Sequence, residues 1–247
     1  GGMAADQAAA GIRSIDSTGT IGILSADVDE PYARPALSKK LWVDAAFHEA
    51  DTDFKTAQKQ NAKVYLKTVV VQLDPQNHQV TTAAKQVFSY DKLLLATGAK
   101  ANTLKNVTTG DLIVALRSKN DYRKIRAFSG NGKHVLVVGN GYIGSEIAAG
   151  LIQSDTKVSY VLDSAHLFDK KLPTALSHEL EEKYTAAGVE FYPNRKAVAA
   201  EVKNHQVVLQ LDDGTELTGD GLVLGLGSRV DYSLAQVAGL KVTENGV

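Results

Sequence analysis

The most specific pattern of potential ligand-binding residues is the segment GNGYIGSE, residues 139–146. It follows the apolar run KHVLVV and opens an apolar stretch with helical periodicity, so it joins a strand to a helix. Its glycines permit a tight turn, a close backbone approach to a phosphate, and close packing of helix on strand. Asp163 lies 19 residues past the last glycine, where a carboxylate can bind a ribose. The segment predicts a dinucleotide pyrophosphate site at the helix N-terminus, the alternative being a glycine turn without a ligand.

The second pattern is PYARPALSKKLW, residues 31–42. Its prolines bound a loop, and Pro35 suits the first turn of a helix. A lysine in that first turn, such as Lys39, is disfavoured by the helix dipole unless a negative group lies nearby. From these residues alone, the lysines are either solvated, or Lys39 has an anionic partner.

The remaining polar residues show no comparable pattern. The histidines have no ligand spacing, so we expect them at the surface and expect no metal site: His48, His78, His134, His166, His178 and His205. Three glutamates, Glu179, Glu181 and Glu182, are expected on a solvated helix face. The chain has no cysteine, which excludes disulfides, thiolate metal sites and redox chemistry through a cysteine pair.

The elements that must position these residues alternate apolar runs with amphipathic helices, as is typical of an α/β fold with a parallel sheet. We expect strands within 20–27, 64–74 and 157–164, and a hairpin followed by a buried strand within 77–99. Helices are expected at 121–128 and at 172–188, where Pro173 suits the first turn and Gly188 the C-terminal end. A meander follows and closes on GLVLGLGS.

The two halves of the chain repeat this order. Each half has a glycine loop that opens a helix, a strand that ends near an aspartate (Asp27 and Asp163), and a meander that closes on an apolar strand running into glycine. The repeat predicts two nucleotide-binding modules of one build. The second module has a leading strand, whereas the first begins directly at GGMAADQAAA. Either Gly1 and Gly2 precede a true start at Met3, or the first strand is missing.

Length and composition limit the classes of function. A chain of 247 residues with 44% hydrophobic and 22% charged residues can form one large or two modest globular domains. Because the net charge is −1 and no long basic run exists, nucleic acid is a poor candidate partner. No apolar stretch approaches the ~18 residues of a membrane span, and we expect a cytoplasmic location.

The segments LSADVDEPYARPALSKKLW, YDKLLLATGA, VVGNGYIGSE and GLGSRVDYSLAQVAGL together resemble the apoptosis-inducing-factor and ferredoxin-reductase branch of the FAD/NAD-linked reductases, within the pyridine nucleotide-disulfide oxidoreductase superfamily. The match follows essentially the whole chain in order. The resemblance implies two Rossmann-like modules, each with a small β-meander, the NAD module being inserted into the FAD module. We expect an FAD module at 1–108, an NAD(H) module at 109–229, and a return to the FAD module at 230–247. We also expect the family's first strand and C-terminal domain to lie outside this chain.

The resemblance also implies roles for individual residues. FAD contacts are implied for Gly2 and Ala5 at the pyrophosphate, Asp27 at the ribose, Val70 at the adenine, Arg34 and Lys39 at the flavin, and Ala96, Thr97 and Gly98 at the crossing between domains. NAD(H) contacts are implied for Gly139, Gly141, Ile143 and Gly144 at the pyrophosphate, Asp163 at the ribose, Gly227 at the nicotinamide amide, and Tyr142 over the flavin ring. Lys39 and Glu146 are implied as a catalytic ion pair beside the flavin, although they come from different modules.

The activity implied by the resemblance is that of an FAD-dependent NADH oxidoreductase. It would pass hydride from NADH to the flavin and electrons on to an external acceptor, such as a ferredoxin- or rubredoxin-like carrier, a quinone or dioxygen. Because the chain has no cysteine, a disulfide relay and a cysteine-based oxidase are excluded. Two alternatives are a reductase for a small organic acceptor and a redox-sensing interaction protein that binds FAD and NADH and turns over incidentally.

Overall fold

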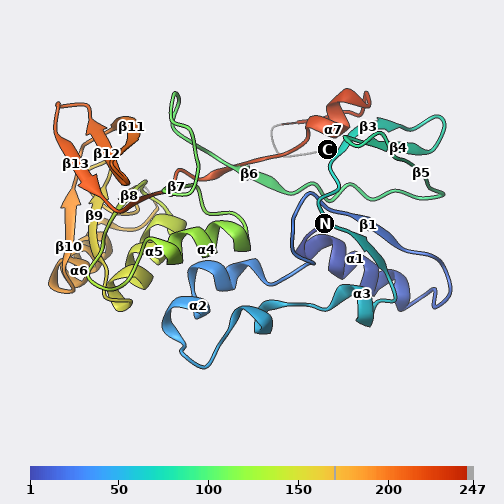
Figure 1. Cartoon of the computed structure of the whole chain (residues 1–247), viewed down its shortest axis with the longest axis horizontal. Helices are drawn as coiled ribbons and strands as arrows, with labels where there is room; N and C mark the ends of the chain where they lie inside the picture. Colours follow the sequence, from blue (N-terminus) through green and yellow to red (C-terminus); the bar gives the residue numbers. More distant parts are fainter. Residues whose placement is uncertain (170, 244–247) are drawn as a thin grey trace. The chain divides into compact units, whose positions relative to one another are not determined.

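The computed structural model describes residues 1–169 and 171–243, which fold into two compact units (Figure 1). Unit 1 comprises residues 1–34, 48–100 and the described residues from Arg229 onward, and unit 2 comprises 35–47 and 101–228. Both units combine helices with strands, which confirms the expected α/β class. In the described part of the chain, no helix is both long enough and apolar enough to cross a membrane.

Unit 2 is built on a five-stranded sheet in which every strand pair is parallel. The strand order is β10 (Val189–Tyr192), β9 (Lys157–Val161), β8 (His134–Val138), β14 (Gly221–Leu224) and β7 (Ile113–Val114). Consecutive residues of β8, Val135 to Val137, are fully buried. Burial on both sides is what a parallel strand requires when both faces of its sheet are covered.

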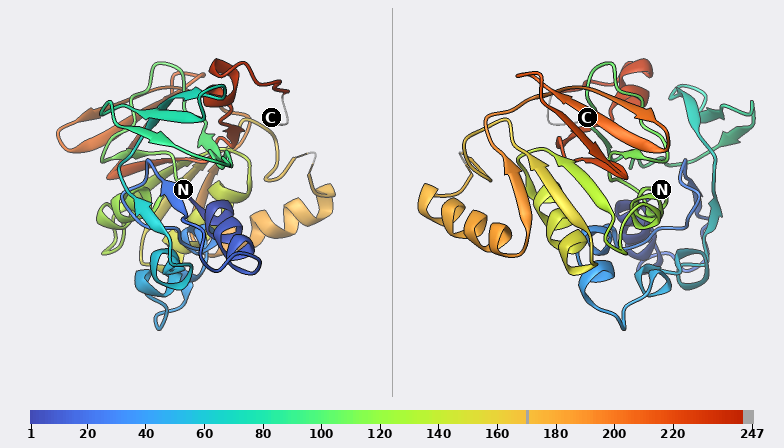
Figure 2. Two further views of the ribbon diagram at one scale, coloured as in Figure 1. Left: turned by 90° about the vertical axis from the view of Figure 1, so that its right-hand side faces the viewer. Right: turned by 60° about the vertical axis from the view of Figure 1, so that its left-hand side comes forward.

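Helices cover one face of this sheet and a meander covers the other (Figure 2). Tyr160 of β9 faces α5 (Tyr142–Gln153), whereas the next residue, Val161, joins a core formed with the meander. That meander is antiparallel and consists of β11 (Ala197–Lys203), β12 (Gln206–Leu211) and β13 (Glu216–Gly219). Two further helices, α4 (Lys119–Ala127) and α6 (Thr174–Ala186), pack on the edge strands β7 and β10.

Unit 1 is smaller and has short sheets. Its first helix, α1 (Met3–Arg13), packs near the parallel pair β1 (Gly22–Leu24) and β2 (Lys63–Tyr65) around a small core. A second, antiparallel sheet is formed by β3 (Val70–Asp74), β4 (Gln79–Thr82) and β5 (Val87–Ser89). The other elements of this unit are η2 (Glu49–Thr52), α3 (Thr56–Lys59) and α7 (Ser233–Val237). Strands β6 (Ala99–Ala101) and β15 (Ser228–Val230) pair with each other.

Residues 91–98 do not form the expected buried strand. The preceding hairpin is present as β4 and β5, but the segment after it is irregular, and Leu94 is 63% exposed. A buried strand needs a neighbouring strand for its backbone hydrogen bonds. Among the residues that the structure describes, residues 91–98 belong to no strand of any sheet, so this prediction is wrong for the present chain.

The compact units also differ from the expected domain boundaries, because residues 35–47 belong to unit 2. This segment contains α2 (Lys40–Val43) and all but the first residue of η1 (Arg34–Ser38), and it is held by Trp42. The indole is 7% exposed, meets the Tyr122 ring edge-on at 5.5 Å between centroids, and lies against Gly150 of α5. Burial of this large aromatic ring attaches the segment to unit 2 even though unit 1 flanks it in sequence. Besides the two crossings on either side of 35–47, the chain passes between the units at 100/101 and 228/229, where the expected boundaries are 108/109 and 229/230.

Replacement of Gly150 by Ala is expected to lower the free energy of unfolding by about 1–3 kcal/mol, as overpacking does. A Cβ there would lie 2.7 Å from Cγ and 2.8 Å from Cβ of Trp42, atoms close to the backbone that cannot swing away. This loss should exceed the gain in helix propensity, which is at most about 1 kcal/mol. Urea unfolding measures the effect.

The matched control is Gly11→Ala in α1, where an added Cβ has no neighbouring heavy atom within 4 Å. This variant should keep or raise the stability, by up to about 1 kcal/mol. Equal stabilities of Gly150→Ala and the unmodified protein would show that Trp42 does not depend on this glycine.

Candidate functional site

The glycine loop of unit 2 joins β8 to α5 as the sequence predicted. Gly139 has a φ of +128°, and a Cβ at this position would collide with the carbonyl of Gly225. A Cβ at Gly144 would lie 2.5 Å from Oη of Tyr160, a phenol whose pKa is raised by burial. Only glycine therefore allows β8, β14 and α5 to approach one another here.

This loop has the features of a pyrophosphate site. Gly141 is the N-cap of α5 and provides no side-chain capping bond, so first-turn N–H groups are available to an anion. Lys171 brings a cation to the same loop: its Nζ donates to the carbonyl of Asn140 at 3.1 Å and lies 5.9 Å from the centre of the Tyr142 ring. The glycine backbone, the helix N-terminus and this cation fit a dinucleotide. Nothing in the sequence marks Lys171, because only the fold brings it to the loop.

The segment after β9 is tied to the glycine loop by Asn140. Its side-chain amide donates to Oγ of Ser164 and to the carbonyl of His166 at 2.9 Å, and accepts from the N–H of Phe168. Asp163 begins this segment and is exposed, as a ribose-binding carboxylate must be, while Leu162 before it is buried. Segment 163–168 therefore lies at the same sheet edge as the glycine loop.

Other predicted NAD(H) residues lie on this edge or on α5. Gly227 follows β14, has a φ of +78°, and accepts the N–H of Asn102 at 2.9 Å. Tyr142 is 62% exposed, and its ring lies 5.2 Å from that of Phe168. Ile143 is half-buried in the first turn of α5. The structure thus gathers the predicted NAD(H) residues within unit 2, in agreement with the rule that ligands bind at the carboxyl ends of parallel strands.

In unit 1, three predicted residues lie together at the N-terminus of α1. Asp27 accepts from Oη of Tyr32 at 3.1 Å and pairs with Arg34 at 3.4 Å. The Arg34 guanidinium also lies 3.4 Å from the ideal Cβ position of Gly2, the uncapped N-cap of α1. Ala5 follows in the first turns of this helix. The structure places Arg34 beside the predicted pyrophosphate site, and this position, together with the role of Tyr32, is not visible in the sequence.

The remaining predicted FAD residues fall into two places. Val70 is the first residue of β3. Three residues before it, Lys67 donates its backbone N–H to the carbonyl of Asp27 at 2.9 Å. Thr97 and Gly98 contact Asp231 through a hydroxyl bond of 2.5 Å and a backbone bond of 2.9 Å, and Ala96 precedes them. Burial raises the pKa of Asp231, but hydrogen bonds from Ser233 and Lys100 outweigh this and lower it overall. The described hydrogen bonds do not join this group to that of Gly2.

Lys39 and Glu146 form the predicted ion pair. Nζ of Lys39 lies 2.9 Å from Oε2 of Glu146, on the second turn of α5. Oγ of Ser38 donates to the same carboxylate oxygen at 2.6 Å, a contact that no pattern in the sequence indicates. Both partners belong to unit 2, because segment 35–47 packs there, so they come from one compact unit and not from two. Their pairing is confirmed, while their role toward a flavin stays a prediction.

Comparison with known proteins identifies the chain. A family model described as pyridine nucleotide-disulphide oxidoreductase matches residues 1–247. The chain belongs to this family. The family is one of FAD-dependent NAD(P)H oxidoreductases with FAD and NAD(H) as cofactors, which confirms the resemblance and the cofactors expected from it.

Similar family members are named as reductases of electron carriers. The chain is 29% identical to the ferredoxin–NAD(+) reductase component of 3-phenylpropionate/cinnamic acid dioxygenase from Photorhabdus laumondii, over 100% of this chain and 63% of that protein. It is also 29% identical to the nitric oxide reductase FlRd-NAD(+) reductase of Escherichia coli, over 98% of this chain and 64% of the relative. The chain thus spans less than two thirds of the length of these curated relatives.

Solved structures of family members have the same fold. The reductase in the covalent putidaredoxin reductase–putidaredoxin complex superposes with a TM-score of 0.88 at 26% identity, over 98% of this chain and 60% of that one. A ferredoxin reductase from Rhodopseudomonas palustris superposes with a TM-score of 0.85 at 26% identity, over 98% of this chain and 61% of that one.

The Lys39–Glu146 pair should contribute little to the stability of this family member. Lys39 is 55% exposed and Glu146 25% exposed, and exposed ion pairs contribute about 0–1 kcal/mol. We therefore expect Lys39→Ala to change the free energy of unfolding by less than about 1 kcal/mol. Trp42→Ala, only three residues further on, should cost about 3–5 kcal/mol because it empties a buried site. Urea unfolding compares them, and similar losses for both variants would contradict this assignment.

Proposed function

We propose that the protein is an FAD-dependent NADH oxidoreductase that passes electrons to a separate carrier protein of the ferredoxin type. The observation that supports it best is the position of the Ser38–Lys39–Glu146 group. Glu146 lies two residues after the last glycine of the predicted NAD(H) loop, so the helix that would hold the dinucleotide also carries the acidic partner of Lys39. The names of the matched relatives favour a protein carrier as the acceptor.

The chain's own residues would bind and orient the two cofactors. When bound, FAD supplies the redox centre that accepts hydride from NADH and releases electrons to the carrier. The N-terminus of α5 and Lys171 would hold the NADH pyrophosphate, and Asp163 would accept hydrogen bonds from the ribose hydroxyls. In unit 1, the N-terminus of α1 and Arg34 offer the corresponding groups for the FAD pyrophosphate. Arg34 would be held ready by its pairing with Asp27.

Lys39 would supply positive charge where reduction makes the flavin more negative. Glu146 and Ser38 would restrict the lysine, because the carboxylate holds both side chains through one oxygen. A lysine held in this way loses less conformational freedom when the charge develops, which is the advantage of electrostatic preorganisation. The pair would act on the rate of hydride transfer and not on folding.

The acceptor is tested by steady-state turnover of the full-length protein with NADH and several acceptors side by side. We expect ferredoxin- and rubredoxin-type carriers to give kcat/KM values well above those of quinones or dioxygen. A higher value with a quinone or a small organic acceptor would reject the carrier. An NADH-reduced flavin that persists in air, with a change of oligomeric state and no turnover with any acceptor, would favour the redox-sensing alternative.

NADH should be preferred over NADPH. A 2′-phosphate needs Arg or Lys just past the second strand, but VLDSAHLF has neither, and Asp163 is exposed and would repel the phosphate. A repulsion of about 1.4 kcal/mol corresponds to tenfold, so we expect kcat/KM for NADH to be at least about tenfold higher. Stopped-flow or steady-state kinetics with both nucleotides measure this, and Asp163→Asn should narrow the ratio. Equal efficiencies would remove the role assigned to Asp163.

Lys39→Ala should slow flavin reduction by NADH about tenfold or more, since a charge-assisted hydrogen bond contributes roughly 1.5–3 kcal/mol. Glu146→Ala should impair the same step, and the double variant should be little worse than either, because the residues act as a unit. Stopped-flow absorbance at the flavin band follows the rate at full FAD occupancy.

Lys40→Ala is the matched control, because its ammonium faces the Phe47 ring at 4.8 Å and not Glu146. It should reduce at the unmodified rate. Unchanged rates in both Lys39→Ala and Glu146→Ala, with FAD fully bound, would refute the catalytic role of the pair.

A further inference from the structure

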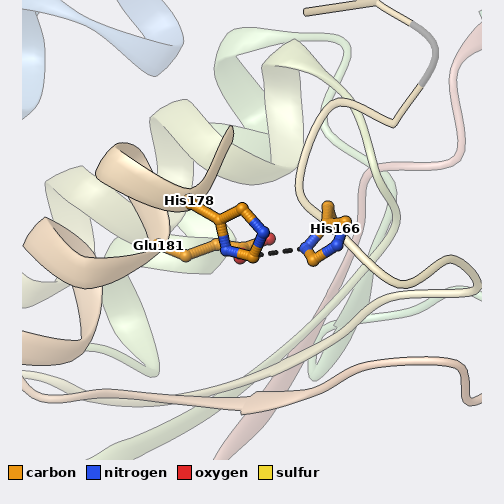
Figure 3. A group of neighbouring side chains, drawn as sticks. All are labelled: His166, His178 and Glu181. Atoms are coloured by element: carbon orange, nitrogen blue, oxygen red, sulfur yellow. Dashed lines mark hydrogen bonds and ion pairs between the residues drawn. The ribbon is translucent and has the colours of Figure 1, made fainter. Parts of the chain in front are cut away.

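His166, His178 and Glu181 bring together three side chains of the types that bind transition metals (Figure 3). One ligand atom from each lies within 4.8 Å of the others. Nδ1 of His166 is 3.3 Å and Nδ1 of His178 is 3.8 Å from the same Glu181 oxygen, Oε2. The two imidazole rings meet at 4.2 Å between centroids. None of these residues is among those assigned above to FAD or NAD(H).

The fold holds His166 and Glu181 in place by hydrogen bonds. His178 and Glu181 are three residues apart on α6 and therefore share one face of that helix. His166 comes from segment 163–168, which Asn140 holds through the carbonyl of His166 itself. The other oxygen of Glu181, Oε1, accepts the N–H of Leu167 at 2.5 Å and so fixes the carboxylate against the segment. Glu181 is only 18% exposed, which corrects the expectation that it lies on a solvated helix face.

The ligand types favour a particular class of cation. Two imidazole nitrogens and one carboxylate oxygen suit Zn²⁺, which binds such groups at about 2.0–2.2 Å. Mg²⁺ and Ca²⁺ prefer oxygen ligands only. Ligand atoms around Zn²⁺ must come somewhat closer than the outer limit of 4.8 Å, a shift within reach of the half-exposed His178 side chain. The surface beside His178 and Glu181 is hollowed, with Glu182 and Thr185 in the lining, so solvent reaches the α6 side of these two side chains.

We propose that His166, His178 and Glu181 form a binding site for a divalent transition-metal cation, Zn²⁺, that clamps segment 163–168 to α6. Without a metal, these side chains form contacts between the Glu181 carboxylate and the two imidazoles, and such a contact is an ion pair only when the imidazole is protonated. The sequence did not reveal the site because its first ligand lies in a loop and twelve residues before the second. The proposal does not depend on FAD or NADH.

The test is isothermal titration of the full-length protein, treated with a chelator and dialysed, with ZnCl₂. We expect one Zn²⁺ per chain, not displaced by Mg²⁺ in large excess, because imidazole ligands suit Zn²⁺ and Mg²⁺ prefers oxygen. Loss of an outer-shell partner costs about tenfold to a hundredfold in metal affinity, so His178→Ala, His166→Ala and Glu181→Gln, which change the ligands themselves, should each weaken Zn²⁺ binding at least as much. Glu181→Gln keeps an oxygen that can accept the Leu167 N–H, so this variant is expected to fold.

Two variants serve as matched controls. Glu179→Gln removes a carboxylate from an exposed position of the same helix, and His205→Asn removes a histidine from a remote turn whose positive φ asparagine tolerates. Both should bind Zn²⁺ as the unmodified protein does. A Zn²⁺-dependent rise in Tm should appear in the unmodified protein and both controls, and be lost in the three ligand variants. Zn²⁺ binding that is absent, or that persists unchanged in folded His178→Ala and Glu181→Gln, would overturn the proposal.

Discussion

The contact of Trp42 with Gly150 is the constraint on which the candidate active site depends. Gly150 and Glu146 are four residues apart on α5, so they lie on one face of the helix. On the facing segment, Trp42 and Lys39 are three residues apart. Seating the indole on the glycine therefore also sets Lys39 against Glu146. Burial of the aromatic ring stabilises the attachment of this segment to α5, whereas the exposed ion pair contributes little to that stability.

The carboxyl edge of the unit 2 sheet shows the same use of small residues. Gly139 and Gly144 allow the loop between β8 and α5 to pack directly against Gly225 and Tyr160, and a side chain at either glycine would collide with these residues. In return, bare backbone N–H groups and a helix N-terminus point to one place. Lys171 and segment 163–168 then complete the rim through Asn140. The close packing of β8 on α5 and the anion binding proposed for the loop would in this way follow from one geometry.

The parts that sequence could predict are those encoded locally. The glycine loop, its strand and its helix follow from spacing within about twenty residues, and the structure has them as expected. The sequence singles out Lys39 because a helix beginning at Pro35 would place it in the first turn, whereas the structure has it between η1 and α2, as the N-cap of α2. Its partner follows only from the family resemblance. Residues 91–98 read as a strand because apolar composition does not show whether a neighbouring strand is available. The sequence predicts a solvated Glu181 because it does not show that segment 163–168 covers this face of α6.

The hydrogen bonds of Asn140 have a consequence for the chemical ageing of the protein. Asn140 precedes a glycine, the residue that least hinders attack of a backbone nitrogen on an asparagine side chain. Loss of the amide would place a new carboxylate in the loop that is proposed to accept a pyrophosphate. Asn131 also precedes a glycine, but it is exposed, with a φ of +53°. The side-chain amide of Asn140 is held by hydrogen bonds to Ser164, His166 and Phe168. We therefore expect Asn140 to deamidate more slowly than Asn131. The contacts that shape the loop thus also protect its charge over the lifetime of the molecule.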